Sequence, residues 1–293
     1  MIIIVSRNRV FRFFSQMLKG ELINLGYECE ICVENLAKEE CLVSNNNIYI
    51  LVGPQLFNQN EIDRIKKAQA KIIGISTEGL HYFQKPKKHT LLGRLNICDV
   101  IWVHEKADMD LIKKVTGKSD VYYFPLGFSR HYQLTDDLEK FSKPQKNIIY
   151  LGHLGNSRRA ETWRNLKRAE SITTCWDNKS YKKLFKENYL FLNLGYPGLT
   201  CYGAPFRLMP LISNNTLIIS QRFDDNDLNR LVIHCDSDSE LNETINYYLK
   251  NPEKAKEKSH EISEWAKNNF SVNQNLIKFG CKNSIDKLIA NPI

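Results

Sequence analysis

The sequence alternates between short apolar segments and longer amphipathic ones. Residues 2–6, 48–53 and 71–76 are apolar runs of strand length, and residues 61–70 carry apolar side chains at helical spacing. Strands that alternate with helices pair in parallel and are joined by right-handed crossovers. The alternation therefore predicts a doubly wound α/β domain in the first half of the chain.

A second alternation begins after a polar segment. Residues 127–147 contain one proline and show no sustained period, which is the composition of a linker. Beyond them, strands are predicted at 148–152 and 190–196. We predict two domains, 1–140 and 141–293, and expect that the final helix can pack back on the first. Ligands of open α/β sheets bind outside the carboxyl ends of the strands, so the chemistry is expected in the cleft between the domains.

The first helix of the second domain is predicted over 158–170, followed by a short strand near 172–176. Two acidic runs, 224–227 and 236–240, each stand at a turn before a helix. Such positions favour helix capping over metal binding, so no metal site is expected.

Composition places the chain among globular proteins. It has 293 residues, of which 42% are hydrophobic and 25% are charged. It has no run of about 18 apolar residues and no secretory leader, so a cytoplasmic protein without a membrane span is expected. Its eight cysteines stand at positions that otherwise look like strand or core, which favours free thiols. Cys29 and Cys32 form a Cys-x-x-Cys pair within a predicted strand, and we interpret them as strand residues rather than a zinc or redox site.

The net charge of +8 mildly favours a polyanionic partner or a phosphate-rich ligand. A Lys- and Asn-rich composition explains the charge equally well. The densest basic cluster, Lys85, Lys87 and Lys88, is predicted to lie in a proline-containing loop. These lysines either contact phosphates, including those of a nucleic acid, or are simply solvated.

The stretch from Gly152 to Arg159 has the pattern of an anion-binding turn. Two glycines, Gly152 and Gly155, follow a strand and precede a helix, so backbone N–H groups there can point at an anion. Arg158 and Arg159 add charges able to form paired hydrogen bonds with phosphate oxygens. A glycine turn with exposed arginines is equally consistent with this pattern. The chain lacks G-x-G-x-x-G after its strands and a P-loop motif, which disfavours dinucleotide binding and P-loop hydrolysis.

Four segments occur in an order that resembles a known group of enzymes. They are Ser76-Thr77-Glu78, Pro125-Leu126-Gly127-Phe128, the loop from Gly152 to Arg159, and Leu192-Asn193-Leu194-Gly195-Tyr196 with Arg207. Over its whole length the chain resembles the two-domain GT-B glycosyltransferases, and most closely their CgeB-like group.

The resemblance implies a nucleotide-diphosphate sugar as donor and no other cofactor. It implies donor contacts in the second domain at Gly152, His153, Gly155, Asn156, Ser157, Arg158, Arg159, Asn193, Tyr196, Tyr202 and Gly203. It also implies that the acceptor lies against the first domain near Thr77, Glu78 and Gly127. Helix N-termini and basic side chains, with Arg207 foremost, are expected to stabilise the leaving diphosphate without an obligatory metal.

Glu78 stands at the end of a predicted strand of the first domain. We interpret it either as the general base or acceptor-orienting residue, or as a carboxylate that caps the following turn. Two alternatives keep the fold and change the function. In the first alternative, the chain is a glycosyltransferase for modified DNA bases, which its basic charge would suit. In the second, it is a non-catalytic nucleotide-sugar-binding module, since the helix that begins near Arg207 carries no acid.

Overall fold

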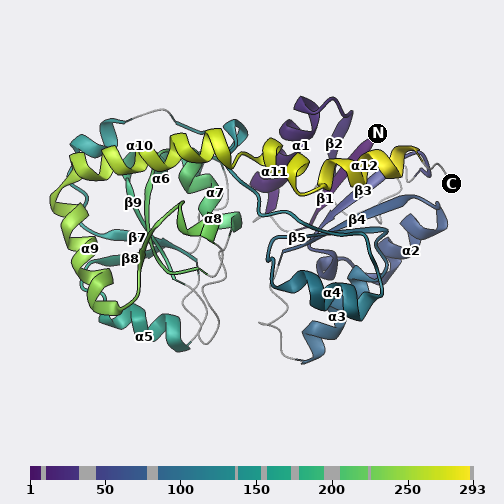
Figure 1. Ribbon diagram of the computed structural model, residues 1–293, viewed down its shortest axis with the longest axis horizontal. Coiled ribbons are helices and arrows are strands. Elements are labelled where there is room, and N and C mark those ends of the chain that lie inside the picture. The colour runs from purple at the N-terminus through teal and green to yellow at the C-terminus, as the bar shows by residue number, and fades with distance from the viewer. Residues whose placement is uncertain are drawn as a thin grey trace. The chain divides into compact units, whose positions relative to one another are not determined.

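The computed structural model describes residues 1–7, 11–32, 44–77, 85–135, 138–152, 157–172, 178–194, 205–223 and 226–290. The chain divides into two compact units. Unit 1 comprises Met1–Leu126 together with Val272–Ile293, and unit 2 comprises Gly127–Ser271. Figure 1 shows a sheet with covering helices in each unit. Among the described helices, each is too short or too polar to cross a lipid bilayer.

Unit 1 contains a six-stranded parallel sheet in the order β2-β1-β3-β4-β5-β6. Its strands are β1 (Ile2–Ser6), β2 (Cys29–Cys32), β3 (Ile48–Val52), β4 (Lys71–Ser76), β5 (Val100–Val103) and β6 (Val121–Tyr123). Its helices are α1 (Arg12–Asn24), α2 (Gln59–Lys67), α3 (Lys85–Leu95), α4 (Asp108–Thr116), α11 (Val272–Lys278) and α12 (Cys281–Ala290). The predicted doubly wound α/β domain is confirmed.

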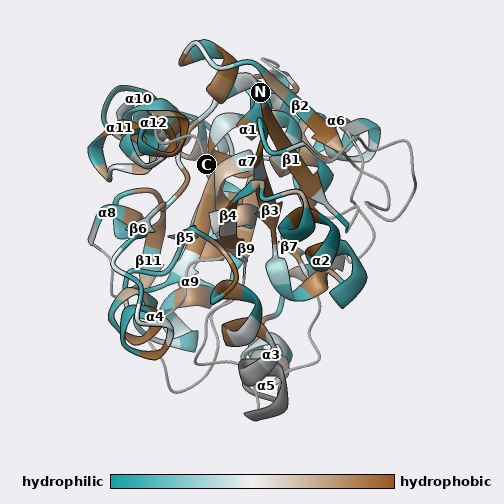
Figure 2. Cartoon of the chain, turned by 90° about the vertical axis from the view of Figure 1, so that its right-hand side faces the viewer, coloured by the Kyte–Doolittle hydropathy of each residue, from teal (hydrophilic) through white to brown (hydrophobic). Residues whose placement is uncertain are grey.

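The strands of unit 1 are apolar because the sheet is covered on both faces. All five residues of β3 are buried, and β1 and β3 are largely brown in Figure 2. The helices have one apolar face only. Helix α2 buries Ile62 and Ile65 and begins at a capping box, in which the Asn58 side chain accepts from the Glu61 N–H at 3.0 Å.

The last two helices belong to unit 1. Trp102, on β5 and fully buried, donates from Nε1 to Ser284 Oγ of α12 at 3.1 Å. The hydroxyl of Tyr27 donates to Asp286 at 2.5 Å, and burial, followed by the bond to Asp286, raises the pKa of this tyrosine. Residues far apart in the sequence thus complete one core.

Unit 2 contains a five-stranded parallel sheet in the order β11-β10-β9-β7-β8. Its strands are β7 (Ile148–Leu151), β8 (Ala169–Ile172), β9 (Leu190–Asn193), β10 (Leu217–Gln221) and β11 (Ile233–Cys235). Its helices are α5 (Ser157–Asn165), α6 (Asn178–Glu187), α7 (Pro205–Ser213), α8 (Asn226–Asn229), α9 (Asp238–Lys250) and α10 (Pro252–Asn269). The capping interpretation of 236–240 is confirmed, since Ser237 Oγ accepts from the Glu240 N–H at 3.2 Å at the start of α9.

The polar segment at the start of unit 2 is packed into its core. Lys140 is only 1% exposed, and its ammonium donates to the carbonyl of Asn214 at 2.6 Å. Gln145 is also buried, and its Oε1 accepts from the N–H of Tyr189 at 2.8 Å. The side-chain amide of Asn214 donates to the carbonyls of Tyr132 and Pro210. Polar side chains in this segment thus satisfy buried backbone groups at the end of α7 and the start of β9.

Two sequence predictions are wrong in detail. The basic cluster at Lys85–Lys88 lies in helix α3, not in a loop, because Pro86 stands in the first turn, where a proline is tolerated. The predicted helix 158–170 ends earlier, at Asn165, and residues 169–172 form strand β8 instead. Pairing with β7, in which Ile148 lies opposite Ala169, overrides the weak helical pattern there.

The two cysteines of the Cys-x-x-Cys pair both lie in β2, and neither forms a disulfide. Cys29 is buried, and its burial raises the pKa of the thiol to about 12. A thiol of this kind is a poor nucleophile and a poor metal ligand at neutral pH. The interpretation of the pair as strand residues is therefore the one the structure favours.

Candidate functional site

The strand order of unit 2 reverses between β7 and β9. From β7 the chain moves to β8 on one side, and β9, β10 and β11 follow on the other side. In open α/β sheets, ligands bind outside the carboxyl ends of the strands at such a reversal. The residues that stand there are Gly152, directly after β7, and Asn193, the last residue of β9.

Arg207, on the first turn of α7, is held at this point by its neighbours. Its Nη1 donates to Oδ1 of Asn193 at 3.0 Å, and its guanidinium lies over the ring of Tyr150, 5.0 Å from the ring centroid. Asn193 is in turn fixed by a bond from its Nδ2 to Ser220 Oγ at 3.0 Å. Because Asn193 and the Tyr150 ring both hold the guanidinium, it is oriented before any ligand binds.

Gly152 leaves the space that this arrangement needs. Its φ is +144°, and a Cβ at this position would lie 3.2 Å from Arg207 Nη2 and 3.1 Å from the Tyr150 hydroxyl. A larger residue would therefore strain the backbone and press on the guanidinium. The glycine predicted from the turn pattern is required here by close contact with an arginine 55 positions later in the chain.

The structure thus brings together two of the predicted donor residues, Gly152 and Asn193, with Arg207, the residue predicted to stabilise the leaving diphosphate. Ser157, Arg158 and Arg159 form the first turn of α5, and their side chains are not described. Seven further predicted site residues lie outside the described residues, and their roles stay predictions: Glu78, His153, Gly155, Asn156, Tyr196, Tyr202 and Gly203.

Sequence reasoning missed Tyr150 and Ser220. Tyr150 is two residues before Gly152, so a strand at this position places both on the same face. An aromatic side chain two residues before a glycine turn was therefore a usable signal. Ser220, a small polar residue in an apolar strand, gives no such signal in the sequence.

The diphosphate contact that the sequence resemblance implies predicts that Gly152→Ala weakens binding of a nucleoside diphosphate by at least roughly 10-fold, because the added methyl displaces the guanidinium. The cost to folding is expected to be about 1–3 kcal/mol, from the strained backbone. Calorimetric titration with UDP measures the first effect. Gly93→Ala is the matched control: nothing lies within 4 Å of the added methyl in helix α3, so UDP affinity should not change. Equal affinity in both variants would contradict the packing described for Gly152.

The carboxyl edge of the unit 1 sheet carries the predicted acceptor residue Thr77. It is buried, and its Oγ1 accepts from Gln55 Nε2 at 3.2 Å. A Cβ at Gly53, whose φ is +70°, would lie 3.1 Å from the same hydroxyl. Gly127, the other described acceptor residue, belongs to unit 2 and follows Leu126, which has a positive φ of 66°. Their role in acceptor binding stays a prediction.

His104 follows β5 at the same edge and is buried. Its Nδ1 lies 2.5 Å from the carbonyl oxygen of Ser76, and its Nε2 lies 3.7 Å from Glu105 Oε1. Burial lowers the pKa of the imidazole to about 4, although the bond to Ser76 opposes this shift. The ring is therefore neutral at physiological pH, with Nδ1–H donating to the carbonyl. His104 is a residue of this edge that sequence reasoning did not single out.

The lowered pKa of His104 predicts acid sensitivity. An unfolded histidine takes up a proton near pH 6.5, whereas the folded one does so near pH 4, so the unfolded state binds more protons between these values. Stability contributed by the neutral ring is thus lost as the pH falls through this window. We expect unfolding free energy to drop by roughly 2 kcal/mol from pH 7 to pH 5, measured by urea denaturation. His104→Gln should remove this part of the pH dependence, whereas His260→Gln, at an exposed position, should keep it.

No protein-family model matches the sequence, and no curated protein is significantly similar to it. Solved structures do match over the whole chain. HepE from Anabaena, solved in complex with UDP and glucose, is 8% identical with a TM-score of 0.61, covering 98% of this chain and 99% of its own. Sucrose-phosphate synthase from Thermosynechococcus elongatus is 9% identical with a TM-score of 0.62, covering 99% of both chains.

A trehalose-6-phosphate synthase, solved in a study of glycosyl transfer with retention, is 10% identical and has a TM-score of 0.56 over 99% of both chains. At such identities, the similarity establishes the fold. The chain has an α/β fold of the GT-B type, built from two parallel sheets of six and five strands.

Proposed function

We propose that this protein is a glycosyltransferase that uses a nucleotide-diphosphate sugar, whose diphosphate binds to unit 2 beside Arg207. The observation that carries the proposal is the oriented guanidinium, held by Asn193 and Tyr150 at the point where the sheet order reverses. Neighbours of the same fold support it, since HepE was solved with UDP and glucose. The finer assignment to the CgeB-like group is part of this proposal.

The chemistry follows from the charge that develops in the reaction. When the bond between the sugar and the diphosphate breaks, negative charge grows on the leaving phosphate oxygen. A guanidinium that donates two parallel hydrogen bonds stabilises this charge without reorganising. The amino end of α5, which begins at Ser157 directly after the predicted Gly-rich loop, adds its helix dipole. We propose that these groups take the place of a metal ion.

The acceptor is proposed to bind to the carboxyl edge of unit 1, near Thr77 and Glu78. Glu78 is proposed as the group that accepts the proton of the attacking hydroxyl. A hexose or a pentose as the transferred sugar is compatible with this proposal. Incubation of Glu78→Gln with saturating donor and acceptor tests the assignment, because an unchanged transfer rate would remove Glu78 from the chemistry.

The function is tested by incubating the protein with a panel of nucleotide sugars and measuring release of nucleoside diphosphate. We expect slow release from at least one of them in the presence of EDTA, since hydrolysis is a common side reaction of donor sites without acceptor. Asn193→Leu removes the bond that orients Arg207 and should reduce the release. Binding of nucleotide sugar with no turnover, for any donor and in crude acceptor extracts, would instead support a non-catalytic binding module.

A further inference from the structure

A pocket of about 310 Å³ opens at the amino-terminal edge of the unit 1 sheet. It lies where β1, β3 and β4 begin, at Ile2, Ile48 and Lys71, and is closed on one side by Leu288 and Ile289 of α12. This edge is opposite to the one that carries Thr77. At about 3.3 Å per residue, a strand of five residues separates the two edges by roughly 16 Å.

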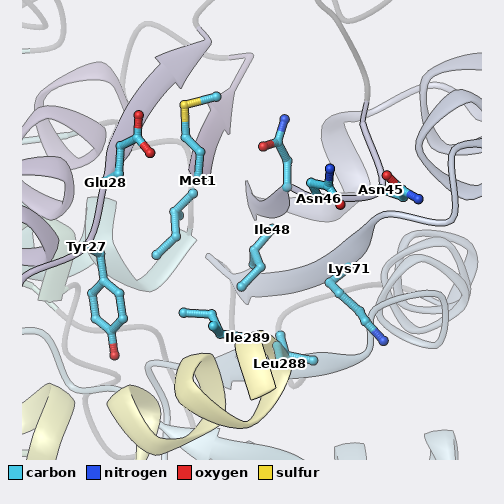
Figure 3. Close-up of a pocket in the computed structure, with 11 residues that line it drawn as sticks. Met1, Tyr27, Glu28, Asn45, Asn46, Ile48, Lys71, Leu288 and Ile289 are labelled. Atoms are coloured by element: carbon cyan, nitrogen blue, oxygen red, sulfur yellow. The ribbon is translucent and has the colours of Figure 1, made fainter. Parts of the chain in front are cut away.

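The pocket has an apolar floor and a polar rim. Figure 3 shows Glu28 and Lys71 on opposite sides of Ile48, with the side chains of Leu288 and Ile289 below. The polar residues of the rim are Glu28, Asn45, Asn46, Asn47 and Lys71. An apolar surface bordered by a few convergent polar groups is the usual design of a small-molecule site, and the volume is at the lower end of such sites.

The rim side chains have no partners of their own among the described residues. None of the five makes a side-chain hydrogen bond or an ion pair there, although other surface charges of unit 1 do, such as Lys287 with Asp120 at 2.9 Å. Asn47 is only 9% exposed, yet its amide has no intramolecular bond. The polar atoms of this amide are not fully buried, so a ligand in the pocket can take the place of the water that bonds to it.

We propose that this pocket is a binding site for a saccharide unit. Each of three adjacent asparagine amides offers both a donor and an acceptor, as the neighbouring hydroxyls of a sugar ring require. Glu28 accepts from hydroxyls and Lys71 donates to them. The aliphatic side chains of Ile48 and Ile289 provide a surface for the C–H face of the ring.

The site is independent of the proposed sugar transfer. It shares no residue with the diphosphate site of unit 2, so saccharide binding here should not compete with UDP. Failure of one proposal therefore leaves the other standing.

The test is direct binding, by calorimetry and NMR, of maltose, cellobiose, lactose and diacetylchitobiose at millimolar concentrations. Ile289→Trp places a large ring on the pocket rim and should reduce the affinity at least 10-fold. The matched control is Ile277→Trp on α11, because the two isoleucines are 54% and 53% exposed and only Ile289 lines the pocket. The control should bind the saccharide within twofold of the unmodified protein.

A second readout uses chemical acetylation followed by mass spectrometry. Bound saccharide should protect Lys71 and leave the exposed Lys67 unprotected. The proposal is overturned if no saccharide of the panel binds, if binding is equal in the two tryptophan variants, or if UDP displaces the saccharide. Binding of leucine in place of the saccharides would also overturn it, since the pocket would then hold a zwitterion between Glu28 and Lys71.

Discussion

Replacement of Arg207 by alanine is expected to lower kcat/KM for the proposed nucleotide-sugar donor by roughly 100- to 1,000-fold, the range for loss of one oriented hydrogen-bond donor in an active site. The guanidinium is held by Asn193 at 3.0 Å and by the Tyr150 ring before the ligand arrives. Its removal therefore takes away an oriented charge and leaves the backbone in place. Steady-state kinetics with the active donor measures the effect.

Arg207→Lys keeps the charge and loses the paired donors, so its kcat/KM should lie between those of the unmodified protein and Arg207→Ala. The control is Arg222→Ala, an exposed arginine of unit 2 whose ion pair with Asp236 lies at the surface. Its kinetics should not change. An Arg207→Ala protein with unaltered kcat/KM would remove this residue, and with it the proposed diphosphate site, from the reaction.

Replacement of Asn214 by alanine is expected to destabilise unit 2 by roughly 3–5 kcal/mol. Its Oδ1 accepts from the N–H of Leu134 at 2.7 Å, and its Nδ2 donates to the carbonyls of Tyr132 and Pro210 at 2.8 and 2.7 Å. The residue is fully buried, so the alanine leaves these backbone groups without partners and away from water.

Urea denaturation with fluorescence detection measures the loss of unfolding free energy in Asn214→Ala. Thermal unfolding of the same variant should show a fall of about 10 °C in Tm. Asn251→Ala is the control, because this exposed asparagine makes one surface bond to Tyr247. Its loss should cost less than about 1 kcal/mol. A cost for Asn214→Ala as small as that of the control would show that the buried network does not hold the end of α7.

The fold was predictable because its signals are local. Strands such as 71–76 are continuous apolar runs, and the glycine at 117 ends α4 in the left-handed conformation, as expected for a helix stop. The prediction for 169–172 was wrong because the local pattern there is weakly helical and gives no strand signal. These residues are mixed in polarity, and β8 forms because β7 offers an unpaired edge to it.

The candidate site was predictable only in part. Arg207 and Asn193 were proposed from their order along the chain, and the structure places them in contact. The aromatic support from Tyr150 and the bond from Asn193 to Ser220 depend on which strands become neighbours. The burial of Lys140 is a further case, because a lysine in a polar segment gives no sign that its ammonium will bond to a buried carbonyl.

The central claim is that unit 2 binds a nucleoside diphosphate where its strand order reverses. A crystal structure of the protein with UDP tests it most directly. The account predicts diphosphate oxygens within hydrogen-bonding distance of the Arg207 guanidinium and beside Gly152, with the guanidinium still over the Tyr150 ring. A diphosphate bound elsewhere on the chain, or no bound UDP at saturating concentration, would contradict it.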